Sequence, residues 1–151
     1  SKTEFSPNAE LTRGMVVTIL YRMEGEPLTA GAKTFSDVKA GLYYSKAVDW
    51  AAEKNIVNGF SDGTFKPEQP VTREQLAAII SRYAVSKGIV VYDAANALAS
   101  TDVVSAWARS NVAWAAAEGI LTKTETTNAT KTASRAEVAT AIYTYLTKTA
   151  K

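Results

Sequence analysis

Three arginines occupy the same kind of place in the chain, and each could bind an anion. Arg13, Arg73 and Arg135 each follow a serine or threonine and precede apolar residues at the spacing of one helical face. A hydroxyl side chain before such a face is a preferred helix N-cap, and Thr72 with Gln75 completes the capping-box pattern. The sequence therefore places each arginine in the first turn of a helix.

The first turn is an unfavourable place for a cation, because the helix dipole favours acids there by about 0.3–1 kcal/mol. A bound anion would offset this cost, since free backbone N–H groups at a helix start and a planar guanidinium together form a receptor for carboxylate or phosphate. The alternative is that each arginine pairs with a nearby acid, Asp37 or Asp102 being candidates, and joins parts of the fold. The residues alone leave both interpretations open.

The helices that carry these arginines are copies of one element. Residues around Arg13 recur around Arg73 at a constant spacing of sixty residues, and recur around Arg135 sixty-two residues further on. The shared apolar face is Val16, Ile19, Leu20 and Met23 in the first copy, Leu76, Ile79, Ile80 and Tyr83 in the second, and Val138, Ala141, Ile142 and Tyr145 in the third. We expect three equivalent amphipathic helices.

A second element, built around a tryptophan, occurs twice. Asp37 and Asp102 each open it, Trp50 and Trp114 each lie among alanines in its middle, and residues that tolerate a left-handed backbone, Asn55 and Gly119, close it. One repeat is thus an acidic lead-in, a tryptophan helix, a loop and an arginine helix.

This repeat predicts an all-α protein of tandem helical repeats, with helices near residues 12–24, 45–55, 72–85, 105–118 and 134–147. The second half of repeat 1 spans 1–24, repeat 2 spans 35–85 and repeat 3 spans 100–147, in one compact domain. Repeat 1 lacks its tryptophan half, so we expect a second chain, or an upstream segment of the parent protein, to cover the apolar face of the helix at 12–23.

The tryptophans are expected mainly in the core. Trp50 and Trp114 lie mid-helix beside alanines, and Trp107 precedes Trp114 by seven residues on about the same face. An indole edge at a groove could still cover the apolar face of a sugar while its N–H finds an acceptor.

The loop of repeat 2 is the most complete. Gly59 opens it, Asp62 begins a tight turn, and two prolines delay the next helix. A calcium loop needs several oxygen ligands at alternating positions, but Phe65 and Lys66 stand where such ligands belong, so we expect a turn without metal. The matching segment of repeat 3, residues 121–132, is rich in threonine and lysine, and we expect a mobile loop there.

Composition excludes several classes of site. The 151 residues include no cysteine and no histidine, which removes disulfides, thiolate metal sites and the commonest general base. A net charge of +2 without a basic run gives no reason to expect nucleic acid, and no apolar run is long enough for a membrane span. A glycosidase needs two carboxylates facing each other across a cleft, whereas Asp37 and Asp102 hold equivalent places in different repeats. We therefore expect no enzyme and no cofactor.

Together these features resemble the S-layer homology domain of bacterial cell-surface proteins. The matching stretches are Phe35-Ser36-Asp37-Val38, Trp50-Ala51, the loop from Gly59 to Pro67, and the Thr-Arg or Ser-Arg helix starts. The resemblance covers nearly the whole chain. It departs in the missing half of repeat 1, at Gly14 and Met15, and in repeat 3, which has lost the Gly-Asp-Gly loop.

The resemblance implies three repeats in a pseudo-threefold, three-pronged helical assembly. It implies that the module lies outside the cell, binds secondary cell-wall polysaccharide carrying pyruvate ketals, and anchors an exported protein to the bacterial envelope. The alternative is a structural or protein–protein interaction module on the same scaffold, without a sugar site.

On this basis the ligand-binding residues are drawn from the lead-ins, the tryptophans, the repeat 2 loop and the helix starts: Arg73, Asp37, Trp50, Gly59, Thr72, Arg13, Arg135, Asp102 and Trp114. Only repeat 2 has every part of the pattern. We therefore predict Arg73 as the main contact for the anion.

Overall fold

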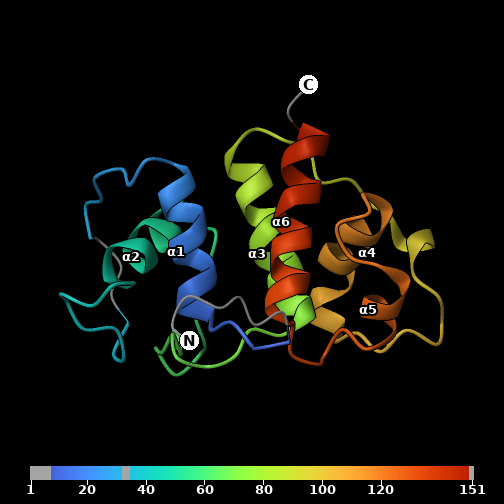
Figure 1. The fold of residues 1–151 in the computed structure, drawn as a ribbon, viewed down its shortest axis with the longest axis horizontal. Coiled ribbons are helices and arrows are strands. Elements are labelled where there is room, and N and C mark those ends of the chain that lie inside the picture. The colour runs from blue at the N-terminus through green and yellow to red at the C-terminus, as the bar shows by residue number, and fades with distance from the viewer. Residues whose placement is uncertain (1–7, 32–34, 150–151) are drawn as a thin grey trace. The chain divides into compact units, whose positions relative to one another are not determined.

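The computed structural model describes residues 8–31 and 35–149. The helices are α1 (Arg13–Met23), α2 (Ser45–Glu53), α3 (Arg73–Ser86), α4 (Arg109–Ala117), α5 (Lys123–Thr127) and α6 (Arg135–Thr149), with the short 3-10 turns η1 (Ala95–Ala97) and η2 (Ala106–Ala108) (Figure 1). Pairing between extended residues in this part of the chain is limited to isolated bridges. The all-α prediction and the five predicted helices are confirmed. None of the helices described is both long and apolar enough to cross a membrane.

The chain divides into two units. The first combines Ser1–Leu11, Pro70–Ser81 and Val91–Lys151, and the second combines Thr12–Gln69 and Arg82–Val90. Helix α3 therefore begins in the first unit and ends in the second.

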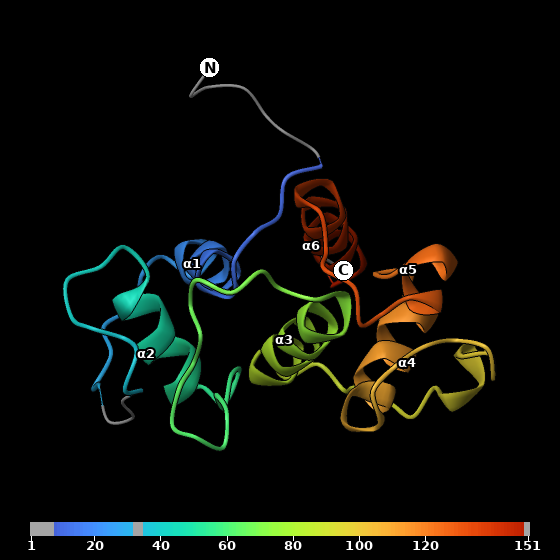
Figure 2. The same cartoon turned by 90° about the horizontal axis from the view of Figure 1, so that it is seen from below.

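The core of the second unit forms where α2 crosses and packs against α1 (Figures 1 and 2). The rings of Tyr21 and Trp50 are 5.7 Å apart, and Trp50 meets Tyr83 from the end of α3 at 6.3 Å. Val16 and Leu20 of α1 are buried, whereas Met23 at its end is 38% exposed. The apolar face of α1, expected to need an outside partner, is thus largely covered within the unit by the tryptophan helix of repeat 2.

The core of the first unit joins the start of α3, α4, α5 and α6. Trp114 of α4, Leu76 of α3 and Val138 of α6 are each at most 1% exposed. The Glu74 carboxylate at the start of α3 accepts hydrogen bonds from the Ser105 N–H at 2.8 Å and the Ser105 hydroxyl at 2.6 Å. These hydrogen bonds connect the residues that precede α4 to the start of α3.

The helix ends follow the predicted cap chemistry. The Thr72 N–H donates to Gln75 Oε1 at 3.1 Å, and the Gln75 N–H donates to Thr72 Oγ1 at 3.2 Å, which is the predicted capping box. Asn55 has φ 60° and Gly119 has φ 73°, so both tryptophan helices end in the left-handed conformation predicted for them.

The prediction of a mobile loop over residues 121–132 is wrong. This segment contains α5, which starts with a capping box between Thr122 and Glu125, and both Thr126 and Ala129 are fully buried. The Thr-x-x-Glu pattern that marks such a helix start is present in the sequence but follows no long apolar face.

The expected core position of Trp107 is also wrong, because its side chain is 54% exposed. Trp107 lies in η2, a 3-10 turn that precedes α4. A 3-10 turn has about three residues per turn instead of 3.6, so the seven-residue register of an α-helix does not reach back to Trp107.

Candidate functional site

The start of each arginine helix is closed by the same backbone hydrogen bond. The N–H of Arg13 donates to the Gln69 carbonyl at 2.9 Å, that of Arg73 to the Lys131 carbonyl at 2.9 Å, and that of Arg135 to the Ala9 carbonyl at 2.7 Å. Gln69 lies just after the repeat 2 loop, and Ala9 and Lys131 are its equivalents in repeats 1 and 3. An arginine helix therefore meets the loop of the following repeat, and the helix of repeat 3 meets residues from repeat 1.

This pattern brings Arg13 to the loop of repeat 2. The Gly14 N–H donates to the Pro67 carbonyl at 2.8 Å, and a Cβ atom on Gly14 would lie 3.0 Å from that oxygen and 3.2 Å from the ring of Tyr44. A residue with a side chain would crowd this contact. The unusual glycine after Arg13 is thus the sequence signal that α1 and this loop approach closely.

The side chain of Arg13 lies between two aromatic rings of the loop. Its Nε donates to the Phe65 carbonyl at 2.9 Å, and its Cζ lies 4.8 Å from the ring centre of Phe60 and 4.7 Å from that of Phe65. The residue is only 7% exposed. Among the described residues, no carboxylate lies within salt-bridge distance of its guanidinium.

Burial lowers the pKa of Arg13 to about 10, and the nearby positive charge of Arg82 acts in the same direction, while Asp37 opposes both. Burial also lowers the pKa of Arg82. Arg13 stays charged near neutral pH, since its pKa remains well above 7. The loop thus surrounds a desolvated cation that an anion would stabilise.

Asp37 holds the backbone of the same loop. Its carboxylate accepts hydrogen bonds from the N–H of Phe65 at 2.9 Å and the N–H of Lys66 at 2.8 Å. Lys66 has φ 58°, and its Nζ lies 4.2 Å from the ring centre of Phe60. The Asp37 carboxylate therefore fixes the backbone of the loop that surrounds Arg13.

Gly59 and Asp62 fix the two ends of the turn. Gly59 has φ 74°, and a Cβ atom there would lie 2.3 Å from a ring carbon of Phe35. Asp62 Oδ1 accepts from the Thr64 N–H at 3.1 Å and the Thr64 hydroxyl at 2.6 Å, which confirms the predicted turn. The described residues contain no group of three or more acidic side chains that could hold a metal ion.

The corresponding arginine in the first unit is already paired with an acid. Arg73 Nε donates to Glu137 Oε1 at 3.1 Å, its Nη2 donates to Glu137 Oε2 at 2.7 Å, and its Nη1 donates to the Asn128 carbonyl at 3.2 Å. The hydrogen bonds that Arg73 donates to Glu137 raise the pKa of Arg73. The alternative in which an arginine pairs with an acid thus holds for Arg73, although the acid is neither Asp37 nor Asp102.

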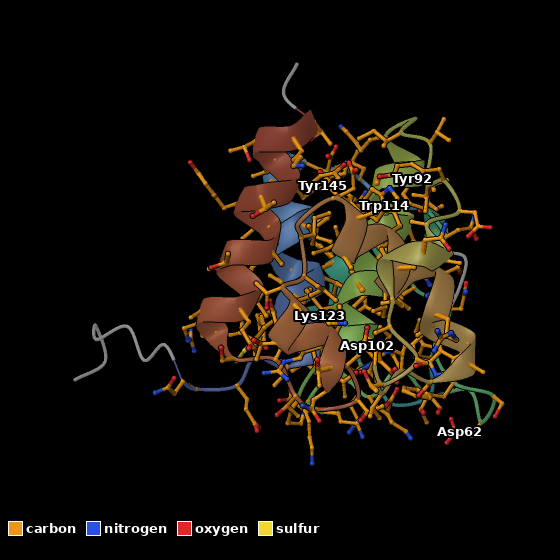
Figure 3. All side chains as sticks on the ribbon, turned by 90° about the vertical axis from the view of Figure 1, so that its right-hand side faces the viewer. Asp62, Tyr92, Asp102, Trp114, Lys123 and Tyr145 are labelled. Carbon is orange, nitrogen blue, oxygen red and sulfur yellow. The ribbon has the colours of Figure 1, made fainter. Side chains whose placement is uncertain are left out.

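Asp102, the equivalent of Asp37, has a different partner. Lys123 Nζ lies 2.8 and 2.9 Å from its two carboxylate oxygens, and Figure 3 shows the two side chains next to each other. The hydrogen bond from Lys123 lowers the pKa of Asp102. Charges at this place in repeat 3 are therefore compensated by residues of the chain itself.

The remaining predicted residues lie in the core or at helix starts. Trp50 is 3% and Trp114 is 1% exposed, so neither indole can cover a sugar ring in this structure. Thr72 caps α3. The Nε of Arg135 is buried without a hydrogen-bond partner among the described residues.

The structure brings Arg13, Asp37 and Gly59 together in the second unit, while Arg73, Thr72, Asp102, Arg135 and Trp114 belong to the first. Phe60, Phe65 and Arg82 act on Arg13 through ring contacts, a backbone hydrogen bond or charge, but they were not among the predicted site residues. Neither was Lys66, whose Nζ lies over the ring of Phe60. Two phenylalanines and a lysine within one short loop were the available signal.

Comparison with known proteins identifies the class to which this fold and loop belong. Residues 34–77, which include Asp37 and the whole Gly59–Pro67 loop, match the S-layer homology domain. Residues 34–77 are an S-layer homology domain, and this match and the names of the relatives support a cell-wall anchoring module that lies outside a bacterial cell.

Relatives match the chain well beyond this segment. An amylopullulanase of Thermoanaerobacterium thermosulfurigenes is 33% identical over 97% of the chain and 8% of its own length. A cellulosome-anchoring protein of Acetivibrio thermocellus is 24% identical over 78% of the chain and 27% of its own length. The outer membrane protein SlpA of Thermus thermophilus is 46% identical over 34% of the chain and 6% of its own length. The chain thus spans a small part of each relative.

Proposed function

We propose that the chain is a non-catalytic module that binds acidic, pyruvylated secondary cell-wall polysaccharide, with Arg13 as the main contact for the carboxylate. The observation that carries this proposal is the desolvated Arg13 guanidinium, which lies between Phe60 and Phe65 with no carboxylate in salt-bridge distance among the described residues. Asp37 and Gly59 contribute by holding the loop in shape.

The ligand chemistry follows from the cation. A pyruvate ketal carries a carboxylate, and a guanidinium can bind a carboxylate through two parallel hydrogen bonds, which are among the stronger polar contacts in proteins. Lys66 adds a second positive charge on the same loop, and it is only half-buried. Arg73 has the same place in its repeat, but Glu137 already occupies its hydrogen-bonding edge. Arg73, the main contact predicted from the sequence, remains a candidate, and titration of variants at both positions compares it with Arg13.

One observation favours the alternative, a structural or protein-interaction module. In the first unit, Arg73 pairs with Glu137 and Asp102 pairs with Lys123, so these positions serve the fold without any ligand. If Arg13 serves the fold in the same way, the chain would not bind the polysaccharide on its own.

Calorimetric titration with a pyruvylated saccharide tests the proposal. Arg13→Lys keeps the charge and most of the stem but loses the planar set of donors, so we expect at least about tenfold weaker binding. Arg73→Lys is the matched control and should bind like the wild type. Circular dichroism of both variants checks that the helices are intact. Equal binding by Arg13→Lys and the wild type, or a larger loss in Arg73→Lys, would reject Arg13 as the main contact.

Pull-down with purified cell walls separates this function from the structural alternative. Walls stripped of acidic polysaccharide should lose the wild-type chain. Retention on stripped walls would favour a protein partner instead.

A further inference from the structure

Asn58 is the one asparagine of the chain that is followed by a glycine, and the other five precede alanine, isoleucine or valine. Asparagine is a chemically labile residue, because the backbone nitrogen of the next residue can attack its side-chain Cγ. A side chain on that next residue shields the nitrogen, whereas glycine has none. The Asn58-Gly59 pair is therefore the place where this chain can most readily undergo the reaction.

The fold requires a glycine at position 59. Gly59 has φ 74°, a backbone conformation that glycine adopts without steric cost. A Cβ atom there would lie 2.3 Å from a ring carbon of Phe35 and 2.8 Å from the carbonyl oxygen of Thr64. The loop that surrounds Arg13 therefore contains an unshielded backbone nitrogen directly after an asparagine, as a consequence of its own geometry.

The hydrogen bonds of the loop do not hold this nitrogen. The Phe60 N–H donates to the Thr64 carbonyl at 2.8 Å, and the Gly63 N–H donates to the Phe60 carbonyl at 3.0 Å. Among the described residues, none accepts a hydrogen bond from the Gly59 N–H. The Gly59 nitrogen can thus lose its proton without breaking a hydrogen bond of the loop, and Asn58 beside it is exposed to the water that the reaction needs.

We propose that Asn58 is a site of spontaneous deamidation. The deprotonated Gly59 nitrogen attacks the Asn58 Cγ, a new C–N bond closes a succinimide ring, and the bond from Cγ to the side-chain nitrogen breaks with release of ammonia. Water then adds to one of the two ring carbonyls and opens the ring. Opening on one side gives aspartate, and opening on the other gives isoaspartate, in which the main chain runs through the former side chain.

Either product changes the loop that surrounds Arg13. Both add a negative charge, and isoaspartate also lengthens the main chain by one methylene group directly before Gly59, which packs against Phe35. The same loop places the rings of Phe60 and Phe65 on the Arg13 guanidinium. We therefore expect the modified loop to lose its shape and to repel an anion. This last effect rests on the proposed function, whereas the modification itself does not.

Ageing of the intact chain in mildly alkaline buffer, followed by peptide mass analysis with fragmentation, tests the modification. We expect the mass increase of deamidation at residue 58, with the other asparagines intact. Asp62 also precedes a glycine, but it has no amide to lose, so its mass stays the same. Asn58→Gln is the matched control and should stay unmodified, because glutamine must close a larger ring. A wild-type chain that keeps Asn58 while other asparagines are converted overturns the proposal, whatever the variant does.

Two further measurements show what the modification does to the loop. The backbone amide NMR signals of Phe65 and Lys66, which donate to Asp37, should shift in the aged wild type and stay unchanged in aged Asn58→Gln. In calorimetric titration with a pyruvylated saccharide, the number of binding sites per chain should fall in step with the modified fraction. Unshifted signals in a modified chain overturn the effect on the loop. If fresh protein does not bind the saccharide, the proposed function fails, while the mass analysis and the amide signals still decide the present proposal.

Discussion

The pair formed by Arg73 and Glu137 should contribute measurably to stability without any ligand. Glu137 accepts two hydrogen bonds from Arg73, at 3.1 and 2.7 Å, and its Oε1 also accepts the Ser134 N–H at 2.9 Å. One carboxylate thus caps α6 and fixes the first side chain of α3. Removing either partner should weaken the packing of these two helix starts.

The geometry sets the expected magnitude. Hydrogen bonds to charged groups contribute about 1.5–3 kcal/mol each when well buried. The Arg73 and Glu137 side chains are 17% and 23% exposed, so solvent screens the pair in part. We therefore expect a coupling free energy of about 1–2 kcal/mol between the two residues.

A double-mutant cycle measures this coupling. Urea unfolding is followed for the wild type, Arg73→Met, Glu137→Gln and the double variant. Glu137→Gln keeps an oxygen that can cap the Ser134 N–H, so it removes the ion pair while preserving the helix start. A coupling below about 0.3 kcal/mol would refute the reasoning, because Arg73 would then be energetically free to serve a ligand.

Two further predictions concern pH and the loop. Burial alone would raise the pKa of Glu137, but the hydrogen bonds from Arg73 and the Ser134 N–H lower it further than burial raises it, so the net shift is downward. Its contribution to stability is therefore complete above its ordinary pKa of 4.5 and is lost as pH falls through the lower value of the folded state. In urea unfolding between about pH 3 and 6, the free energy of unfolding should fall less steeply with decreasing pH in Glu137→Gln than in the wild type. The same pH dependence in both proteins would contradict this assignment. Gly59→Ala should destabilise the fold by about 2 kcal/mol more than Gly63→Ala. Both glycines have positive φ, but only Gly59 lies against Phe35. Equal thermal stabilities of the two variants would show that the Phe35 contact is unimportant.

Local features of the sequence were sufficient to predict the helices. Each predicted helix combined a cap residue with an apolar face, and these signals act within about one turn, so Thr72 and Gln75 could be paired without knowing the fold. The exception is α5, where a valid capping box was overlooked because the segment is polar. Trp107 was misplaced because a 3-10 turn interrupts the helical register.

The candidate site depends on contacts between residues that lie far apart in the sequence. Arg13 binds the Phe65 carbonyl across 52 residues, while Arg73 directly follows the loop in sequence and pairs with Glu137 across 64 residues. Arg73 was predicted because it follows the loop in sequence, whereas the proposal of Arg13 is based on contacts in the fold. Spacing alone could not show that an arginine helix contacts the loop of the following repeat and not the loop of its own, since every repeat has the same order of elements.

Ala9 and Glu10 contact residues that are synthesised more than 120 residues later. The Ala9 carbonyl accepts from the Arg135 N–H, and the Glu10 carboxylate accepts from the Thr132 hydroxyl across 122 residues. A ribosome delivers the chain from its N-terminus, so these two hydrogen bonds form only after residues 132 and 135 have emerged. Translation that stops before residue 132 would leave both hydrogen bonds unmade, and the truncated product would be open to proteolysis.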